Sequence, residues 1–213
     1  MSRTRFPYLT RAIKEAPVIE IPRVDGKGTY KFRVYSFGEA GAMISHELIR
    51  EISRGLAKSV SKYFPGFDLA VGIDIEGINW AHMATYDLYE LYGLNKSYTG
   101  FWSTRGYNPD FIRALKKSGK YGFVEVSSPF EKETLSYNRD AFKPNEKVLV
   151  FDDIVSEGRT LDAVFNVLIN ELCCRVVGAQ VILAKSDGYK RVEDRWGVQI
   201  RFLKKSRNNS VVP

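Results

Sequence analysis

The sequence has 213 residues, of which 44% are hydrophobic and 27% charged, and 32 Lys and Arg against 25 Asp and Glu give a formal net charge of +7. This is the composition of an ordinary globular protein, and no stretch approaches the roughly 18 consecutive apolar residues of a membrane-spanning helix. The amino-terminal segment has no apolar region followed by a small-residue cleavage site, so we expect a cytoplasmic protein rather than a secreted or membrane protein.

Helical periodicity and short apolar runs alternate along the first half of the chain. Apolar residues at three- and four-residue spacing predict a helix over 43–60, and an apolar run predicts a strand over 67–73. A second helix with apolar positions within 81–91 and a strand over 98–102 follow. Breakers within the basic stretch 103–120 indicate a mobile loop with at most one short helix.

The second half continues the alternation. A strand is predicted over 121–126, and the continuous apolar run 147–151 is typical of a strand buried on both faces of a parallel sheet. A helix over 161–172 and a strand over 176–184 come next. Repeated strand–helix–strand units predict an α/β fold with a mostly parallel sheet covered on both faces. The first forty and the last twenty residues do not fit this alternation, so we expect them to form a cap and an edge.

The two cysteines and two histidines indicate neither a disulfide framework nor a zinc site. Cys173 and Cys174 are adjacent within the predicted helical stretch, which argues against a disulfide framework and for reduced thiols. His46 and His82 are the only histidines, and we expect no His/Cys zinc site. The positive net charge instead favours an anionic partner, either nucleic acid or a phosphorylated small molecule.

The clearest functional pattern lies between residues 148 and 161. A buried strand ends at Asp152 and Asp153, and a short glycine-containing turn ending at Thr160 opens a helix. Free N–H groups meet the positive end of the helix dipole at such a turn, so it can hold a phosphate, and the two carboxylates can accept hydrogen bonds from sugar hydroxyls. The alternative is that the two aspartates merely cap the strand and Gly158 merely fits a turn.

This string resembles the phosphoribosyl-pyrophosphate (PRPP) signature of type I phosphoribosyltransferases. The resemblance implies their fold, a central mostly parallel sheet flanked by helices with a small amino-terminal hood. It implies ribose binding by Asp152 and Asp153, and binding of the 5-phosphate by Ser156, Glu157, Gly158, Arg159 and Thr160. Glu157 stands where the family usually has Thr, so we expect it either to point away and pair with a basic residue or to tune affinity for phosphorylated ligands. The alternative is that Glu157 serves as the catalytic acid or base.

Residues 67–94 resemble the pyrophosphate-loop region of adenine phosphoribosyltransferases. The resemblance implies a pyrophosphate-binding loop with a cis peptide at its start, formed by Asp74, Ile75, Glu76 and Gly77. The cis bond is expected at Asp74–Ile75. Glu76 stands where that family commonly has Arg, and Arg105 is a candidate to supply the missing cation, although a loop arginine is usually just solvated.

Two further stretches resemble the same branch. Lys31, Phe32 and Arg33, in a strand predicted over 29–34, resemble the hood segment in which a Phe stacks on adenine and neighbouring groups read its edge. The alternative is that Phe32 is an ordinary core residue.

Residues 127–147 resemble the flexible catalytic loop and the approach to the PRPP strand. Pro129 takes the place of the family's loop glutamate, and Glu131 or Glu133 lies within a few residues. Of these, Glu131 is the candidate for handling the proton at the purine ring. A loop over 103–133 is expected to close over the site and exclude water.

The resemblance implies a purine phosphoribosyltransferase that transfers ribose 5-phosphate from PRPP to adenine, giving AMP and pyrophosphate, as in purine salvage. Magnesium would be carried by PRPP, with no metal ligands assigned to the chain, and the protein would be a homodimer. Hypoxanthine, guanine or xanthine could replace adenine, and a non-catalytic PRPP-sensing regulator remains an alternative. Nucleic-acid binding is the weakest reading, because neither a helix-turn-helix appendage nor an RNP-like aromatic motif is found.

The expected organisation has three parts. Residues 1–40 form the hood, residues 41–205 the phosphoribosyltransferase core, and residues 206–213 a carboxy-terminal tail.

Overall fold

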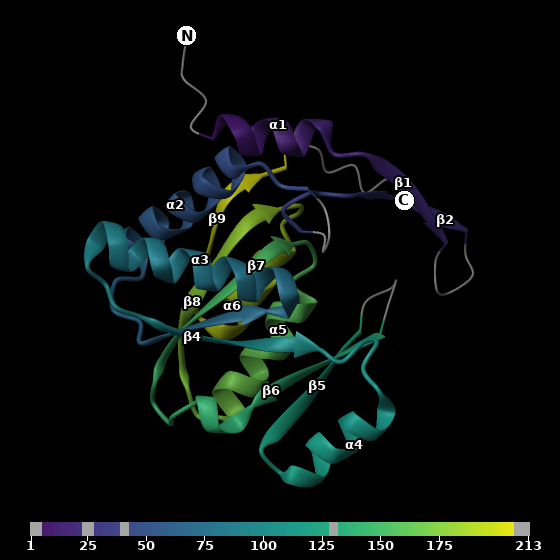
Figure 1. Ribbon diagram of the computed structural model, residues 1–213, viewed down its shortest axis with the longest axis vertical. Helices are drawn as coiled ribbons and strands as arrows, with labels where there is room; N and C mark the ends of the chain where they lie inside the picture. Colours follow the sequence, from purple (N-terminus) through teal and green to yellow (C-terminus); the bar gives the residue numbers. More distant parts are fainter. Residues whose placement is uncertain (1–5, 23–27, 39–42, 128–131, 207–213) are drawn as a thin grey trace.

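The central strands are apolar runs that lie side by side and parallel. The computed structural model describes residues 6–22, 28–38, 43–127 and 132–206, and places seven strands in one sheet of order β5-β6-β4-β3-β7-β8-β9 (Figure 1). Its parallel part consists of β4 (Ser97–Ser103), β3 (Leu69–Ile73), β7 (Lys147–Val155), β8 (Arg175–Ala184) and β9 (Gln199–Lys205). Every residue of β3 is buried, as expected for a strand covered on both faces. The expected α/β fold, a mostly parallel central sheet, is confirmed.

Two separate hydrophobic clusters cover the two faces of the sheet. On one face, α2 (His46–Tyr63) and α3 (Asp74–Tyr92) pack with Ala70, Leu149 and Ile182 of the strands. On the other face, α5 (Arg159–Asn166), its continuation as a π-helical segment over Val167–Glu171, and α6 (Gly188–Trp196) pack with alternate residues such as Val71 and Val150. The alternation along each strand therefore assigns its side chains to opposite layers.

The predicted helices and strands of the parallel core are confirmed with shifted ends. The helix predicted over 43–60 begins at His46, because Ser45 caps it by accepting a hydrogen bond from Leu48 N at 3.3 Å. The expected edge at the carboxy-terminal end is β9, the last strand of the sheet. No helix in the described ranges is long and apolar enough to cross a membrane.

The segment 103–133, expected to form a closing loop, contains more regular structure than a loop, although the strand predicted over 121–126 is confirmed as β5 and the one short helix allowed within 103–120 is present. Residues 109–118 form a ten-residue helix, α4 (Pro109–Ser118), and β5 (Tyr121–Ser127) pairs antiparallel with β6 (Lys132–Asn138) along its whole length. A short 3₁₀ turn follows at Arg139–Ala141. The hairpin joins the sheet where β6 pairs antiparallel with the end of β4, so regular hydrogen bonding fixes most of the segment expected to be mobile.

The amino-terminal region adds one helix and a two-stranded sheet. It contains α1 (Pro7–Glu15), β1 (Val18–Pro22) and β2 (Thr29–Arg33), and β2 confirms the strand predicted there. In Figure 1, α1 lies over α2 while β1 and β2 extend to the upper right. Leu9 N donates a 2.7 Å hydrogen bond to Glu51 Oε1, and buried Trp80 donates from Nε1 to Phe37 O at 2.9 Å. The region therefore shares its core with α2 and α3.

Candidate functional site

The predicted phosphate and ribose residues lie together at the carboxyl end of β7. Asp152 and Asp153 are still part of the strand, Ser156 to Gly158 form a three-residue turn, and α5 begins at Arg159. Gly158 has a φ of 75°, and a Cβ atom there would lie 2.6 Å from Val192 Cγ2. Glycine is therefore needed at this turn both for its conformation and for the close approach of α6.

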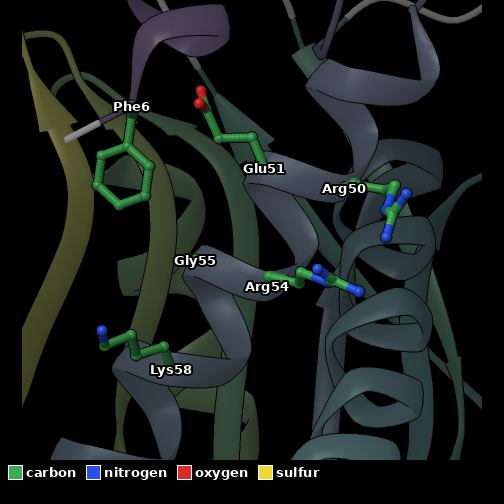
Figure 2. A pocket seen from close by; sticks show the side chains of 6 residues that line it. All are labelled: Phe6, Arg50, Glu51, Arg54, Gly55 and Lys58. Carbon is green, nitrogen blue, oxygen red and sulfur yellow. The ribbon is translucent and has the colours of Figure 1, made fainter. Parts of the chain in front are cut away.

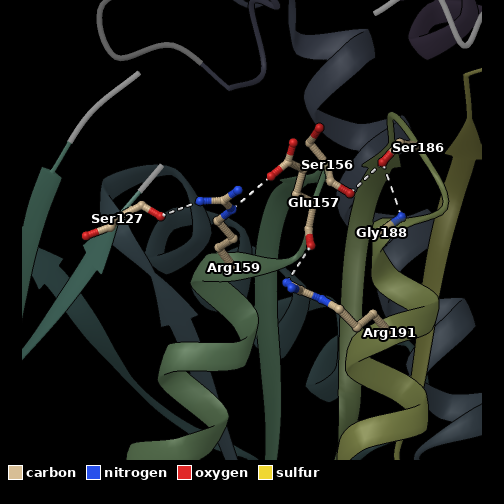
Figure 3. A network of polar contacts seen from close by, with 7 residues as sticks. All are labelled: Ser127, Ser156, Glu157, Arg159, Ser186, Gly188 and Arg191. Atoms are coloured by element: carbon tan, nitrogen blue, oxygen red, sulfur yellow. Dashed lines mark hydrogen bonds and ion pairs between the residues drawn. The ribbon is translucent and has the colours of Figure 1, made fainter. Parts of the chain in front are cut away.

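Polar side chains from α6 and from the segment between β8 and α6 hold the turn by its carbonyl groups (Figure 3). Ser186 Oγ donates to Ser156 O at 2.6 Å, and Arg191 Nη2 donates to Glu157 O at 3.1 Å. The first N–H groups of α5 have no acceptor within the helix and lie at the positive end of its dipole. The junction is thus a braced turn that can donate hydrogen bonds to an anion.

Glu157, the residue that departs from the family pattern, is paired with a cation. Its Oε2 accepts a 2.8 Å hydrogen bond from Arg159 Nε, and Arg159 Nη1 also donates to Ser127 O at 3.4 Å (Figure 3). Both charged side chains remain about half exposed, at 57% for Glu157 and 45% for Arg159. The expected pairing with a basic residue is therefore present, and the cation is Arg159, the first residue of α5 directly after the phosphate turn Ser156–Gly158.

The two aspartates form an acidic pair in which Asp152 is buried and Asp153 is partly buried. Asp152 Oδ1 accepts a hydrogen bond from Asp153 N at 3.0 Å, and Asp152 is only 8% exposed. Burial, with the nearby charge of Asp153, raises the pKa of Asp152 well above its usual range. Burial, assisted by the charge of Glu76, raises the pKa of Asp153 to about 7, although hydrogen bonds with Asp152 and the Ile154 backbone and the charge of Lys185 oppose the shift. This pair is costly to keep ionised, which is a common feature of functional sites.

The segment predicted as a pyrophosphate loop is instead the first turn of a helix. Asp74 directly follows β3 and is the first residue of α3. Its φ of 55° lies in the left-handed region, so this single residue connects strand to helix where a loop was expected. The described residues contain no cis peptide bond, so the expectation of one at Asp74–Ile75 is wrong. A Cβ on Gly77 would lie 2.8 Å from Phe151 O, so this glycine lets α3 pack closely on β7.

Arg105 lies near this helix start through contacts around Ser103. Ser103 N donates to Asp74 Oδ1 at 3.4 Å, and Ser103 Oγ donates to Glu133 Oε1 at 2.5 Å. Arg105 Nη2 lies 3.6 Å from the same Glu133 oxygen, and its backbone N donates to Ser103 Oγ. These contacts bring together β4, β6 and α3. Glu133 accepts a hydrogen bond from Ser103 and forms an ion pair with Arg105. Glu131 lies outside the described residues.

Lys185, which the sequence analysis did not identify, contacts aromatic rings of the hood segment and lowers the pKa of Asp153 through its charge. Lys185, directly after β8, places Nζ 5.0 Å from the ring centroid of Phe32 and 4.9 Å from that of Tyr35. Of the other two predicted base-binding residues, Arg33 donates from Nη1 to Ile13 O on α1, and Lys31 has an exposed side chain. A lysine directly following a buried strand at the functional edge of the sheet is the signal that could have identified Lys185.

A hollow between the start of α1 and α2 contains none of these residues. It has a volume of about 340 Å³ and lies between the start of α1 and one side of α2, where Glu51 already accepts the hydrogen bond from Leu9 N (Figure 2). Figure 2 shows Arg50 and Arg54 directed away from Phe6. We therefore place the functional site at the carboxyl edge of the sheet. The hollow is lined by Phe6, Arg50, Glu51, Arg54, Gly55 and Lys58.

Comparison with known proteins identifies relatives of this chain. A family model described as the phosphoribosyl transferase domain matches residues 43–201. An adenine phosphoribosyltransferase from Symbiobacterium thermophilum is 34% identical over 106 residues, which cover 42% of this chain and 61% of that protein. A hypoxanthine/guanine phosphoribosyltransferase from Methanobrevibacter ruminantium is 25% identical over 197 residues, covering 92% of this chain and 90% of that protein.

Solved structures share the fold at low sequence identity. Adenine phosphoribosyltransferase from Trypanosoma brucei, determined with AMP, pyrophosphate and ribose 5-phosphate, superposes with a TM-score of 0.67 and 16% identity. That match covers 100% of this chain and 87% of the other. The enzyme from Rhodothermus marinus gives a TM-score of 0.63 and 17% identity, covering 94% of this chain and 99% of the other.

Proposed function

The chain belongs to the phosphoribosyltransferase family, and on that premise we propose that it transfers ribose 5-phosphate from PRPP to adenine, releasing AMP and pyrophosphate. The observation that carries the proposal is the junction of β7 and α5, where an acidic pair precedes a braced turn and a helix start. The acidic pair suits the ribose hydroxyls of PRPP, and the turn with the helix start suits its 5-phosphate.

In this proposal the residues of the turn and the acidic pair orient the substrate. The N–H groups at the start of α5 and the side chain of Thr160 bind the 5-phosphate, and Asp152 and Asp153 bind the ribose hydroxyls and thereby fix C1′. C1′ becomes oxocarbenium-like as pyrophosphate leaves, so catalysis depends on stabilising the leaving group and excluding water. The magnesium ion that enters with PRPP neutralises part of the pyrophosphate charge.

The leaving group is assigned to the start of α3. Asp74 and Glu76 add negative charge there, so Arg105 is the nearby side chain proposed to offset the pyrophosphate. Glu131 remains the proposed residue for the proton at the purine ring, and Phe32, with Lys31 and Arg33 beside it, remains the proposed contact for the base.

A second candidate, hypoxanthine or guanine as the base, is favoured by Lys185. Its ammonium group lies over Phe32, the proposed stacking residue, and an ammonium can only donate hydrogen bonds. A 6-oxopurine presents an acceptor oxygen where adenine presents an amino donor. Lys185 therefore suits the oxygen, and the name of the relative from M. ruminantium, which matches nearly the whole chain, supports the same alternative.

A panel of bases with PRPP and magnesium tests both candidates. Nucleotide formation is measured with adenine, hypoxanthine, guanine and xanthine, using the wild type and Lys185→Met. If Lys185 reads a 6-oxo group, the ratio of kcat/KM for hypoxanthine to that for adenine falls about tenfold or more in the variant, because a hydrogen bond to a charged donor is lost. Lys190→Met, an exposed lysine on α6, serves as the control. Absence of product with every base would favour the non-catalytic PRPP-sensing regulator.

A homodimer in the cytoplasm remains part of the proposal. Its support is the exposed side of α3, where Tyr86 is 62% and Tyr89 is 56% exposed, together with Ile75 at 54%. Several large apolar side chains exposed on one helix are typical of an interaction surface. Analytical ultracentrifugation of the wild type and a Tyr86→Glu, Tyr89→Glu variant tests it, because a dimer through this face should dissociate in the variant.

A further inference from the structure

The phosphate turn already contains an anion of its own. The Glu157 carboxylate accepts from Arg159 Nε at 2.8 Å, and Arg159 is the first residue of the helix whose start is proposed to bind the 5-phosphate. Carboxylate and phosphate oxygens are both acceptors that the arginine fork binds well. A phosphate arriving at the turn must therefore either lie beside the Glu157 carboxylate or take its place on Arg159.

The backbone around Glu157 is anchored independently of its side chain. Arg191 Nη2 holds Glu157 O at 3.1 Å, and Ser186 Oγ holds the preceding carbonyl at 2.6 Å. The Glu157 side chain can thus leave Arg159 by rotation about its own bonds, without any change in the turn. Arg159 keeps a second acceptor, Ser127 O on β5, so its guanidinium stays beside the turn when the carboxylate leaves.

The exposure of the pair makes such an exchange easy. Ion pairs with both partners about half exposed contribute little to folding stability, so a doubly charged phosphate can displace the carboxylate. A neutral sugar offers no charge to compete with it. The pair therefore favours phosphate monoesters over uncharged ligands at this turn.

We infer that Glu157 is a specificity-determining residue that acts as an internal competitor for the 5-phosphate, and that ligand binding exchanges the Glu157 carboxylate for phosphate on Arg159. The inference rests on the proposed function for the identity of the ligand. It differs from simple charge repulsion because the effect of Glu157 passes through Arg159.

A double-mutant cycle tests this route. Binding of inorganic phosphate is measured by calorimetry for the wild type, Glu157→Gln, Arg159→Gln and the double variant. Glu157→Gln should tighten phosphate binding about five- to tenfold at low salt, and the gain should shrink at high salt. In the Arg159→Gln background the same substitution should change affinity less than twofold. Asp194→Asn, which removes an exposed acid from α6, controls for net charge and should have less than a twofold effect.

Two calorimetric results overturn the inference. Unchanged or weaker phosphate binding in Glu157→Gln shows that the carboxylate does not compete. An equal gain in both backgrounds shows through-space repulsion without exchange on Arg159.

If the Arg159→Gln variant binds too weakly for calorimetry, NMR of the Arg159 Nε–Hε group decides the question. The resonances of the wild type and Glu157→Gln should differ without ligand and coincide at saturating phosphate, whereas resonances that never differ contradict the exchange. Because the probe is inorganic phosphate, this outcome is independent of turnover. If no base gives product, the proposed function fails, but the phosphate-binding and NMR results still decide whether the exchange on Arg159 occurs.

Discussion

The junction between β3 and α3 and the junction between β7 and α5 place two helix starts at the same edge of the sheet, because β3 and β7 are parallel neighbours. At β7 a three-residue turn with Gly158 in the left-handed region leads to Arg159 at the start of the helix. At β3 no turn residue intervenes, and Asp74 adopts the left-handed conformation as the first residue of the helix. The two junctions share a topology and differ in the length and charge of what connects strand to helix.

This difference shows that a helix start at the edge of a parallel sheet is not by itself an anion site. Asp74 and Glu76 already place two carboxylates in the first turn of α3, where they interact favourably with the helix dipole. The acid in the first turn of α5, Asp162, is instead paired with Arg195 on α6 at 2.7 Å. An anion at the start of α5 therefore competes only with the Glu157 carboxylate, which is paired with Arg159, whereas one at α3 requires a cation from elsewhere, such as Arg105.

Removing the conformational freedom of the β7 turn should have the largest effect. Gly158→Val forces a β-branched residue to a φ of 75° and puts its Cβ against Val192. We expect kcat/KM for PRPP to fall about 100-fold or more, equivalent to roughly 2.7 kcal/mol of transition-state stabilisation. Gly119→Val is the matched control, because Gly119 has a φ of 70° in open space at the end of α4. Equal losses of activity in both variants would assign the effect to strain alone.

Neutralising the acidic pair should move activity and stability in opposite directions. Asp152→Asn and Asp153→Asn keep the shape of the side chain but weaken charge-assisted hydrogen bonds to ribose, so turnover should fall about tenfold or more. The unfolding free energy at pH 8 should rise, because an ionised carboxylate is no longer held in a buried position. Turnover assays and denaturant unfolding of the same preparations check both halves, and unchanged kinetics in both variants would return the pair to a strand-capping role.

The same pair predicts how stability depends on pH. A carboxyl group whose pKa is raised to about 7 in the folded state binds more protons there than in the unfolded chain, so its contribution to stability is present at low pH and lost as pH rises towards 7. The unfolding free energy should fall by about 2–3 kcal/mol between pH 5 and 8 from this group. Asp153→Asn should flatten that slope, and an identical slope in the variant would contradict the raised pKa.

Removing the cation assigned to the α3 junction should have a moderate effect. Arg105→Ala should raise KM for PRPP about five- to tenfold, as expected for one charge-assisted contact. Arg113→Ala removes another exposed arginine, paired with Asp110 on α4, and should leave KM unchanged. Steady-state kinetics measure KM for PRPP in both variants. Equal changes in KM would contradict the assignment of Arg105 to the pyrophosphate.

The smallest expected effect comes from reducing the negative charge at α3. Glu76→Gln should tighten product inhibition by pyrophosphate about two- to threefold, because one partly screened like charge is removed. Glu90→Gln, an exposed change near the other end of the same helix, should have no effect. Weaker inhibition in Glu76→Gln would show that Glu76 supports the leaving group instead of repelling it.

The parts of the fold and of the site that could be predicted from the sequence are those encoded in short, continuous stretches of chain. The core strands are contiguous apolar runs, and the segment from Asp152 to Thr160 carries its phosphate pattern within nine consecutive residues. The strand β6 was not predicted, because the mixed sequence KETLSYN becomes a strand through its pairing with β5 and β4. The helix α1 was missed because Leu9 is its one buried residue.

The remaining features of the site depend on long-range placement. Lys185 meets Phe32 across more than 150 positions of chain, and Ser103 joins Asp74 to Glu133 from three different elements. A sequence pattern fixes the type of an element far better than its register against a distant one. The start of α3 illustrates a local limit as well, because a left-handed aspartate could replace the expected loop without any distinctive pattern.

The contact between the hood and the core restricts how the enzyme could be redesigned by exchanging segments. Trp80 fixes Phe37 O at 2.9 Å, and a Cβ on Gly38 would lie only 2.1 Å from Asp153 Oδ2. The inner end of the hood thus packs closely against the side chain of Asp153. A chimera that takes a foreign hood to change the preferred base should therefore have its crossover before Tyr35, so that the native Phe37–Gly38 backbone remains with its own acidic pair.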